Sequence, residues 1–364
     1  MGLSKKTNVI GIDIGSHSIK VVQLIKKRKN YELANVASIH LPENTFEEGM
    51  TENPNLVTDA IKHLITIEKI KTKYAITSLS GESVVIKKIT VPQMSEEALS
   101  ESIMIEAAQY IPFDINDVNV DFTILGPVEK DPDEDEFESE EEIGDQIEVL
   151  LVAAKKDIID QRKSILTNAG LVPVVFDLDV FAIENSFSLN YEIEKDKVIG
   201  IINVGASVTN INIMEGGNTG FTRDILVGGN QYTETIGNRL KMDFNNAEKV
   251  KLGANVKEEQ KDEIIPVIMD VVDSLASEIQ KSIEFYSTAA NRNIDSIYLS
   301  GGTSKISGIN HLLNKKLGID VVTLDPLKKI SVNKKRFDPE YIASISPTIA
   351  VATGLAFRRF DDID

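Results

Sequence analysis

Two distant stretches of the chain repeat the same short pattern. Residues 10–20 read IGIDIGSHSIK and residues 199–209 read IGIINVGASVT. In each copy a β-branched run ends near a glycine, Gly15 or Gly205, and a second apolar run follows closely. This pattern predicts a buried strand, a tight turn and a returning strand. Two such hairpins in one chain predict a duplicated α/β scaffold of two lobes, with the hairpins facing each other across a cleft.

The turn of each hairpin suits an anionic phosphate group. Glycine lets backbone N–H groups approach an anion with no side chain in the way, and successive N–H groups form an anion-binding nest. Small hydroxyl groups beside the turns can donate further hydrogen bonds. The candidate phosphate-binding residues are Gly11, Gly15, Ser16, His17, Ser18 and Lys20 around the first turn, and Gly205, Ala206, Thr209, Gly228 and Gly229 around or after the second.

The two hairpins differ in their polar side chains. When Gly15 is aligned with Gly205, Asp13 stands opposite Asn203. Asp13 suits a hydrated Mg²⁺ ion, which usually keeps several waters and takes few protein carboxylates. Asn203 has an oxygen that can accept from a metal-bound water but has no charge, and charged hydrogen bonds are roughly twice as strong as neutral ones. We therefore expect nucleotide binding with slow hydrolysis or none.

A third motif follows the second hairpin. Residues 298–306 read YLSGGTSKI, a short strand followed directly by Gly301, Gly302 and Thr303. We expect this glycine-rich backbone to lie flat against a base or a ribose. Residues 247–251 (AEKVK), which lie between the second hairpin and this motif, are expected on a short helix.

Composition excludes several classes of site. The chain has 364 residues, 42% of them hydrophobic and 26% charged, as in an ordinary globular protein. It has no cysteine, so disulfides, thiolate metal sites and a cysteine nucleophile are ruled out. Its formal net charge of −18 disfavours nucleic acid and anionic lipid. Much of that charge lies at 129–145, which we expect to be a solvated loop.

The N-terminus has no apolar region of the kind found in a signal peptide. No apolar stretch approaches the roughly 20 residues that a transmembrane helix needs. We therefore expect a cytoplasmic protein without direct membrane insertion. The predicted organisation is a first lobe core at 1–80 and 171–195, an inserted subdomain at 81–170 that contains the acidic loop 129–145, a second lobe core at 196–229 and 294–364, and a helical subdomain at 230–293.

The three motifs resemble those of the actin/Hsp70/hexokinase-type ATPase superfamily. Within it, the chain is most similar to the PilM family of type IV pilus assembly proteins. The resemblance rests on VIGIDIGSHSIKVVQL at 9–24, AAQYIPFDINDVNVDFTIL at 107–125 and PTIAVATGLAFR at 347–358. It implies an actin-like (ribonuclease H-like) two-lobed α/β fold with an inserted subdomain of the FtsA/PilM type.

The resemblance also implies ligands and partners. It implies ATP with Mg²⁺ as cofactors, with Glu248 and Lys251 reaching the ribose and the base. It implies a cytoplasmic scaffold, peripheral to the inner membrane, that docks the N-terminal tail of a PilN-type membrane protein. PilO and the assembly ATPase would be indirect partners. The sequence leaves homo-oligomerisation open.

An ATPase also needs a residue that orients the attacking water. Asp177 and Asp179 stand at the end of a predicted strand, where related proteins place such a group. Both are also good candidates for a helix cap. We assign candidate catalytic roles to Asp13 and Asp179.

Two other functions stay open. One is an FtsA-like cell-division protein, although that family anchors itself through a basic amphipathic helix and this chain ends in the acidic residues 361–364. The other is a small-molecule kinase of the same fold, which needs a base for its acceptor hydroxyl. The basic pair Arg358-Arg359 is expected to be ordinary surface.

Overall fold

The computed structural model describes residues 8–28, 30–47, 49–128, 146–254, 256 and 261–358. The predicted acidic loop at 129–145 lies outside these residues. The chain divides into two compact units, one formed by Met1–Gly81 and Ser164–Asp364 and the other by Glu82–Lys163.

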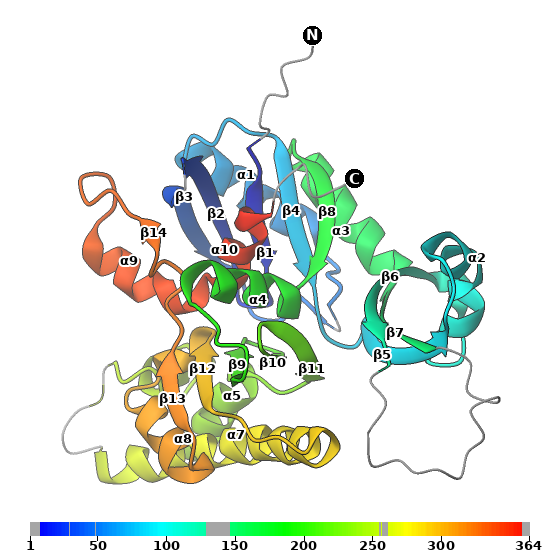
Figure 1. Ribbon diagram of the computed structural model, residues 1–364. Coiled ribbons are helices and arrows are strands. Elements are labelled where there is room, and N and C mark those ends of the chain that lie inside the picture. Colours follow the sequence, from blue (N-terminus) through cyan, green and yellow to red (C-terminus); the bar gives the residue numbers. More distant parts are fainter. Residues whose placement is uncertain are drawn as a thin grey trace. The chain divides into compact units, whose positions relative to one another are not determined.

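The first lobe of the larger unit is built on a six-stranded sheet in the order β14-β3-β2-β1-β4-β8 (Figure 1). β1, β2 and β3 form the predicted antiparallel meander, while β4 and β8 extend the sheet in parallel from β1. The strands are β1 (Ile10–Ile14), β2 (Ser18–Lys27), β3 (Asn30–His40), β4 (Tyr74–Leu79), β8 (Val172–Leu178) and β14 (Ile330–Ser331). The helices are α1 (Pro54–Ile67), α3 (Lys156–Asn168), α4 (Asp179–Asn190), α9 (Pro339–Ile345) and α10 (Ala350–Phe357), with the short 3-10 helix η4 (Ser346–Thr348).

The second lobe is built on a five-stranded sheet in the order β11-β10-β9-β12-β13. Its largest core cluster joins this sheet to the long helix α7. The strands are β9 (Val198–Val204), β10 (Thr209–Glu215), β11 (Asn218–Ile225), β12 (Ser296–Ser300) and β13 (Asp320–Thr323). The helices are α5 (Gly229–Leu240), α6 (Phe244–Lys251), α7 (Lys261–Ala290) and α8 (Ile309–Leu317), with the 3-10 helix η3 (Gly302–Lys305).

The two predicted hairpins have the same backbone geometry. In the first, the Gly15 N–H donates to the Ser18 carbonyl at 3.2 Å, where β1 returns as β2. In the second, the Gly205 N–H donates to the Val208 carbonyl at 2.9 Å, where β9 returns as β10. The alignment of Gly15 with Gly205 made from sequence is therefore confirmed.

The smaller unit has its own three-stranded sheet in the order β5-β7-β6 and its own apolar core. Its helix begins after Ser95, whose side chain accepts from the Ala98 N–H at 3.2 Å. The elements are β5 (Val84–Pro92), α2 (Glu96–Ala107), the 3-10 helix η1 (Ile115–Asp117), β6 (Val118–Pro127) and β7 (Gln146–Lys155). The unit ends earlier than the predicted boundary at 170, because Ile165 and Leu166 pack into the first lobe.

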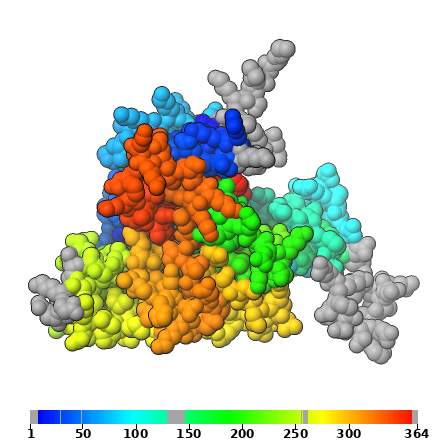
Figure 2. Space-filling view, turned by 60° about the vertical axis from the view of Figure 1, so that its left-hand side comes forward, coloured from blue at the N-terminus to red at the C-terminus, as the bar shows by residue number. Residues whose placement is uncertain are grey.

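The C-terminal segment packs on the first lobe, which corrects its assignment to the second lobe core. β14 pairs with β3, and Leu327, Phe337 and Ile349 share an apolar cluster with β2 and β3. Figure 2 shows this orange-to-red segment against the blue N-terminal residues. The sequence does not reveal which lobe the C-terminal segment packs on, because an apolar segment can pack on either sheet.

Helix α10 lies unusually close to its neighbours. A Cβ on Gly11 of β1 would stand 2.2 Å from the Ala352 carbonyl oxygen, and a Cβ on Gly354 would stand 1.6 Å from the Ala182 carbonyl oxygen of α4. Gly11 therefore serves helix packing, and its predicted role in cofactor binding stays a prediction.

Among the described residues, no single helix is long and apolar enough to cross a membrane. The bent pair Pro339–Thr348 and Ala350–Phe357 passes that test by length and composition alone. In this fold α10 is buried between β1 and α4.

We predict that Gly354→Ala lowers the free energy of unfolding by about 3 kcal/mol or more, because the added methyl group overlaps backbone that cannot rotate away. Chemical denaturation of the unliganded protein measures this. Gly302→Ala is the matched control, because a Cβ there meets nothing within 4 Å. Equal stability of the two variants would contradict the packing argument.

Candidate functional site

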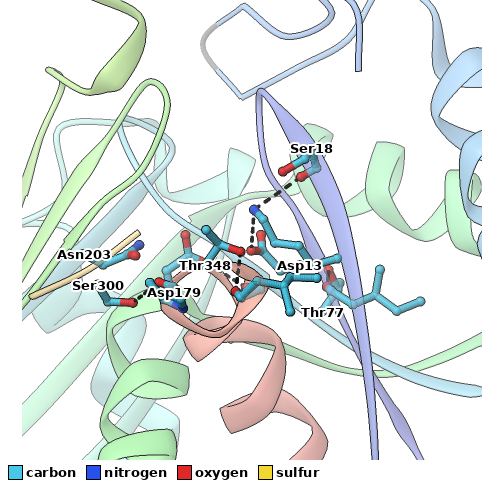
Figure 3. Close-up of polar contacts among 12 residues, drawn as sticks. Asp13, Ser18, Thr77, Asp179, Asn203, Ser300 and Thr348 are labelled. Carbon is cyan, nitrogen blue, oxygen red and sulfur yellow. Dashed lines mark hydrogen bonds and ion pairs between the residues drawn. The ribbon is translucent and has the colours of Figure 1, made fainter. Parts of the chain in front are cut away.

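Asp13 lies at the end of β1, beside the first turn. It is the one polar side chain of a strand whose other residues are apolar or glycine. The Lys20 ammonium donates to Asp13 Oδ2 at 3.0 Å and approaches the Ser18 carbonyl at 3.4 Å (Figure 3). Lys20 therefore acts on Asp13, holding a carboxylate in place beside the turn.

Asp179 is the second carboxylate of the site. Burial raises its pKa to about 7, and the nearby charge of Asp13 adds to this rise, while hydrogen bonds from Ser78 and Ser80 oppose it. A substantial share of Asp179 is therefore neutral near pH 7. The sequence did not reveal the two serines, which follow one another closely at the end of β4.

Neither Asp177 nor Asp179 caps helix α4. The N-cap residue is Leu178, which has no side-chain cap, and Asp179 is the first helical residue. Asp177 instead faces Arg358, whose Nε lies 2.9 Å from its Oδ2. Burial raises the pKa of Asp177 and the Arg358 charge opposes this. Both the cap interpretation and the assignment of Arg358 to ordinary surface are corrected; Arg359 lies outside the described residues.

The second turn is tied to the start of helix α5. The Gly229 N–H donates to the Gly205 carbonyl and the Asn230 N–H donates to the Ala206 carbonyl, both at 2.8 Å. A Cβ on Gly228 would stand 2.6 Å from the Ala206 carbonyl oxygen. Gly228 and Gly229 therefore pack against the backbone of the second turn.

Thr209 does not offer its hydroxyl to the turn. It is fully buried, and its Oγ1 donates to the Val227 carbonyl at 2.7 Å. The Thr209 hydroxyl is therefore not included among the groups proposed to contact phosphate, because it already donates inside the fold.

Lys251 is buried and already has three partners. Its Nζ donates to the Gly229 carbonyl at 3.0 Å and to Thr233 Oγ1 at 2.7 Å, and it pairs with Glu248 at 2.6 Å. An ammonium group has three protons, so none is left for a base. Burial lowers the pKa of Lys251, and Glu248 opposes this. Lys251 thus positions Glu248, and the direct contact that the resemblance implied stays a prediction.

The glycine-rich turn after β12 combines close packing with open space. Gly301 has φ +89°, and its Cβ would stand 2.3 Å from the Val204 carbonyl oxygen. A Cβ on Gly302 would meet nothing within 4 Å. The Thr303 hydroxyl is buried with no hydrogen-bond partner among the described residues, 2.9 Å from where a Gly229 Cβ would stand. Gly302 is thus exposed, whereas the Thr303 hydroxyl lies on the buried side of the turn, next to Gly229.

His17 connects the first turn to helix α6. Its Nε2 lies 3.0 Å from His40 Nδ1. Burial lowers the pKa of His17, and the neighbouring His40 lowers it further. The charge of Glu248 raises this pKa, while that of Lys251 lowers it. The charges of two α6 residues thus act on a residue of the first turn.

Asn203 is the only residue of β9 that is not fully buried. Its Nδ2 donates to Asn210 Oδ1 at 2.9 Å, and Asn210 Nδ2 donates to Asp224 Oδ1 at 2.8 Å. Sequence analysis missed Asn210 and Asp224, although an asparagine in the apolar run TNINIM was a usable signal.

No group of three or more His, Asp or Glu residues that could hold a metal ion occurs in the part of the chain that the structure describes. A Mg²⁺ ion at this site would rely on Asp13, on waters and on oxygens of its ligand.

Two lobes built on equivalent hairpins, with α4 and α10 crossing between the two sheets, define an actin-like ATPase fold (Figure 1). The chain belongs to the PilM family, since the model of "Type IV pilus assembly protein PilM" matches residues 11–360. Membership of this family favours a scaffold of type IV pilus assembly over an FtsA-like division protein or a small-molecule kinase.

Two solved structures illustrate the likeness. A "PilM-PilN type IV pilus biogenesis complex" matches with a TM-score of 0.83 and 30% identity, covering 97% of this chain and 98% of that one. The ethanolamine utilization protein EutJ from Carboxydothermus hydrogenoformans matches with a TM-score of 0.56 and 15% identity, covering 96% and 88%. The second shows the fold alone.

We predict that Asp179→Asn stabilises the unliganded protein at pH 8 but not at pH 4. The raised pKa means that the folded state retains its proton while the unfolded state loses it, so this carboxyl costs stability as pH rises from about 4 to 7. Removing the charge should restore on the order of 2–4 kcal/mol above that window. Denaturant unfolding at both pH values measures it.

The matched control is Asp177→Asn, which removes another buried carboxylate but leaves Arg358 without its partner. Arg358 opposes the rise in the pKa of Asp177, so this variant should gain less stability at pH 8 than Asp179→Asn. An equal or larger gain in Asp177→Asn would contradict the assignment.

Proposed function

We propose that this protein binds ATP with Mg²⁺ between its two hairpins. The observation that carries the proposal is the pairing of two equivalent glycine turns with open space at Gly302 and an unsatisfied buried hydroxyl at Thr303. Backbone N–H groups of residues 16–17 and 206–207 would bind phosphates, since those of Gly15 and Gly205 already donate within their turns. The free carboxylate oxygen of Glu248 would accept from a ribose hydroxyl.

Asp13, oriented by Lys20, would hold water molecules of the Mg²⁺ shell. When bound, the ion supplies neutralisation of phosphate charge. Asn203 would accept from another such water without adding charge. Asp179 is partly neutral near pH 7 and already accepts from Ser78, which makes it a poor base for water. We therefore propose slow hydrolysis or none, with the nucleotide acting on conformation.

We further propose a scaffold role in type IV pilus assembly. The support is family membership and the 30% identity, over nearly the whole chain, to the PilM of the PilM–PilN complex. The chain would dock the N-terminal cytoplasmic tail of a PilN-type inner-membrane protein and would lie at the cytoplasmic face of that membrane. PilO and the assembly ATPase would be indirect partners, through PilN.

Calorimetric titration of Mg-ATP into nucleotide-free protein tests the nucleotide site. We expect micromolar or tighter binding, and at least about a tenfold loss in Asp13→Ala, because a charged hydrogen-bond partner of the ligand is removed. Asp59→Ala on α1 is the control, since that carboxylate is largely exposed. Absence of binding in folded, empty protein would refute an ATP site.

The affinity for the PilN-type tail should differ between the nucleotide-free and the Mg-ATP-bound protein, by about threefold or more. A ligand shifts a conformational equilibrium only through differential binding. Fluorescence anisotropy with a labelled tail peptide measures both affinities. Equal affinities would leave the scaffold role standing but reject nucleotide control of docking.

A further inference from the structure

A relay of three side chains links the second hairpin to the loop after β4. It runs from Asn203 through Asn210 to Asp224, as described above, and ends at the first lobe, where the Gly81 N–H donates to Asp224 Oδ2 at 2.7 Å. Figure 3 shows Asn203 and Ser300, which pair across the neighbouring strands β9 and β12. A Cβ on Gly81 would stand 3.4 Å from Val208 of the second turn.

The charged end of the relay decides the direction of every hydrogen bond in it. An ionised carboxylate only accepts, so Asn210 must turn its NH₂ group toward Asp224. The Asn210 side-chain oxygen then faces Asn203, which must donate to it from its own NH₂ group. The remaining polar atom of Asn203, its Oδ1, is left for the ligand side. Amide orientations are assigned from such networks, and here a carboxylate anchors the assignment.

A backbone donor anchors Asp224. The Gly81 N–H can only donate, so Oδ2 of Asp224 is an acceptor, and the Asn210 amide donates to Oδ1. Burial raises the pKa of Asp224, while these two donors oppose the rise. Glu184 is a second carboxylate between the lobes, bound by Asn212 and Thr219, and it has no link to Asn203.

We propose that Asp224 is a positioning residue that makes Asn203 present an oxygen to the nucleotide site. Through the fixed direction of the relay, Asn203 imitates the acceptor face of an aspartate and takes a metal-bound water, not a bare phosphate oxygen. This inference rests on the proposed nucleotide binding. It assigns to the second hairpin the recognition of the hydrated Mg²⁺ complex of the nucleotide.

Asp224→Asn reverses the relay. Its carbonyl oxygen can keep the Gly81 N–H, and its new NH₂ group then faces Asn210, which must rotate and donate to Asn203 Oδ1. Asn203 would now turn its NH₂ group toward the ligand. We expect the preference for Mg-ATP over ATP in EDTA, measured as the ratio of the two Kd values by calorimetry, to fall about tenfold.

The rescue variant is Asn203→Asp on the Asp224→Asn background. Aspartate at 203 has only acceptors, accepts from the rotated Asn210 and still offers an oxygen to the ligand. The Mg²⁺ preference should return to the wild-type ratio or exceed it. Glu184→Gln is the control, and it should alter stability while leaving the ratio unchanged.

A second variant tests the direction of the hydrogen bonds in the relay and does not require Asp224→Asn to fold. Asn203→Asp alone would place a carboxylate against the Asn210 oxygen, so its melting temperature at pH 8 should fall below that of wild type by a few degrees. A rise would show that Asn210 presents NH₂ to position 203 and would overturn the proposal.

The outcomes separate two kinds of failure. A wild-type protein that binds no ATP, with or without Mg²⁺, refutes the proposed function. A wild type that prefers Mg-ATP, together with an Asp224→Asn variant that keeps the same preference, leaves the function intact and overturns the role of Asp224.

Discussion

The close contact of helix α10 with β1 and α4 is the constraint on which the two-lobed structure depends. Gly11 and Gly354 allow backbone to meet backbone at distances that no side chain permits. This contact fixes β1, and with it Asp13, against the helix that begins with Asp179. It also carries Arg358 to Asp177 at the end of α10. The C-terminal segment therefore helps to build the site although it lies far from the hairpins in the chain.

Several carboxylates are buried where the lobes meet, and each is accommodated by a different device. Asp177 has an arginine, Asp224 has two donors from opposite lobes, and Glu184 accepts from Asn212 and Thr219. Asp179 remains near Asp13 and retains its proton to about pH 7. Burial of a charge without a partner is costly, and each of these devices offsets that cost.

Several predicted ligand residues turned out to position other groups. Lys251 donates its three protons to the Gly229 carbonyl, Thr233 and Glu248, and the Thr209 hydroxyl donates to the Val227 carbonyl. Sequence motifs identify which residues gather near a ligand, but a side chain's partners depend on which backbone carbonyls lie within about 3 Å. That distance is set by packing between elements remote in sequence. Asn210 and Asp224 were missed for the same reason.

The sequence by itself determined the two hairpins, their alignment, the inserted subdomain and the family, because these follow from local β-branched runs, glycine turns and extended motifs. Only the tertiary structure decided that the C-terminal segment packs on the first lobe, that Gly11 serves a helix contact, and that Asp224 directs Asn203. These outcomes depend on which surfaces meet across the junction, and pairings between distant segments leave no periodic signal in the chain.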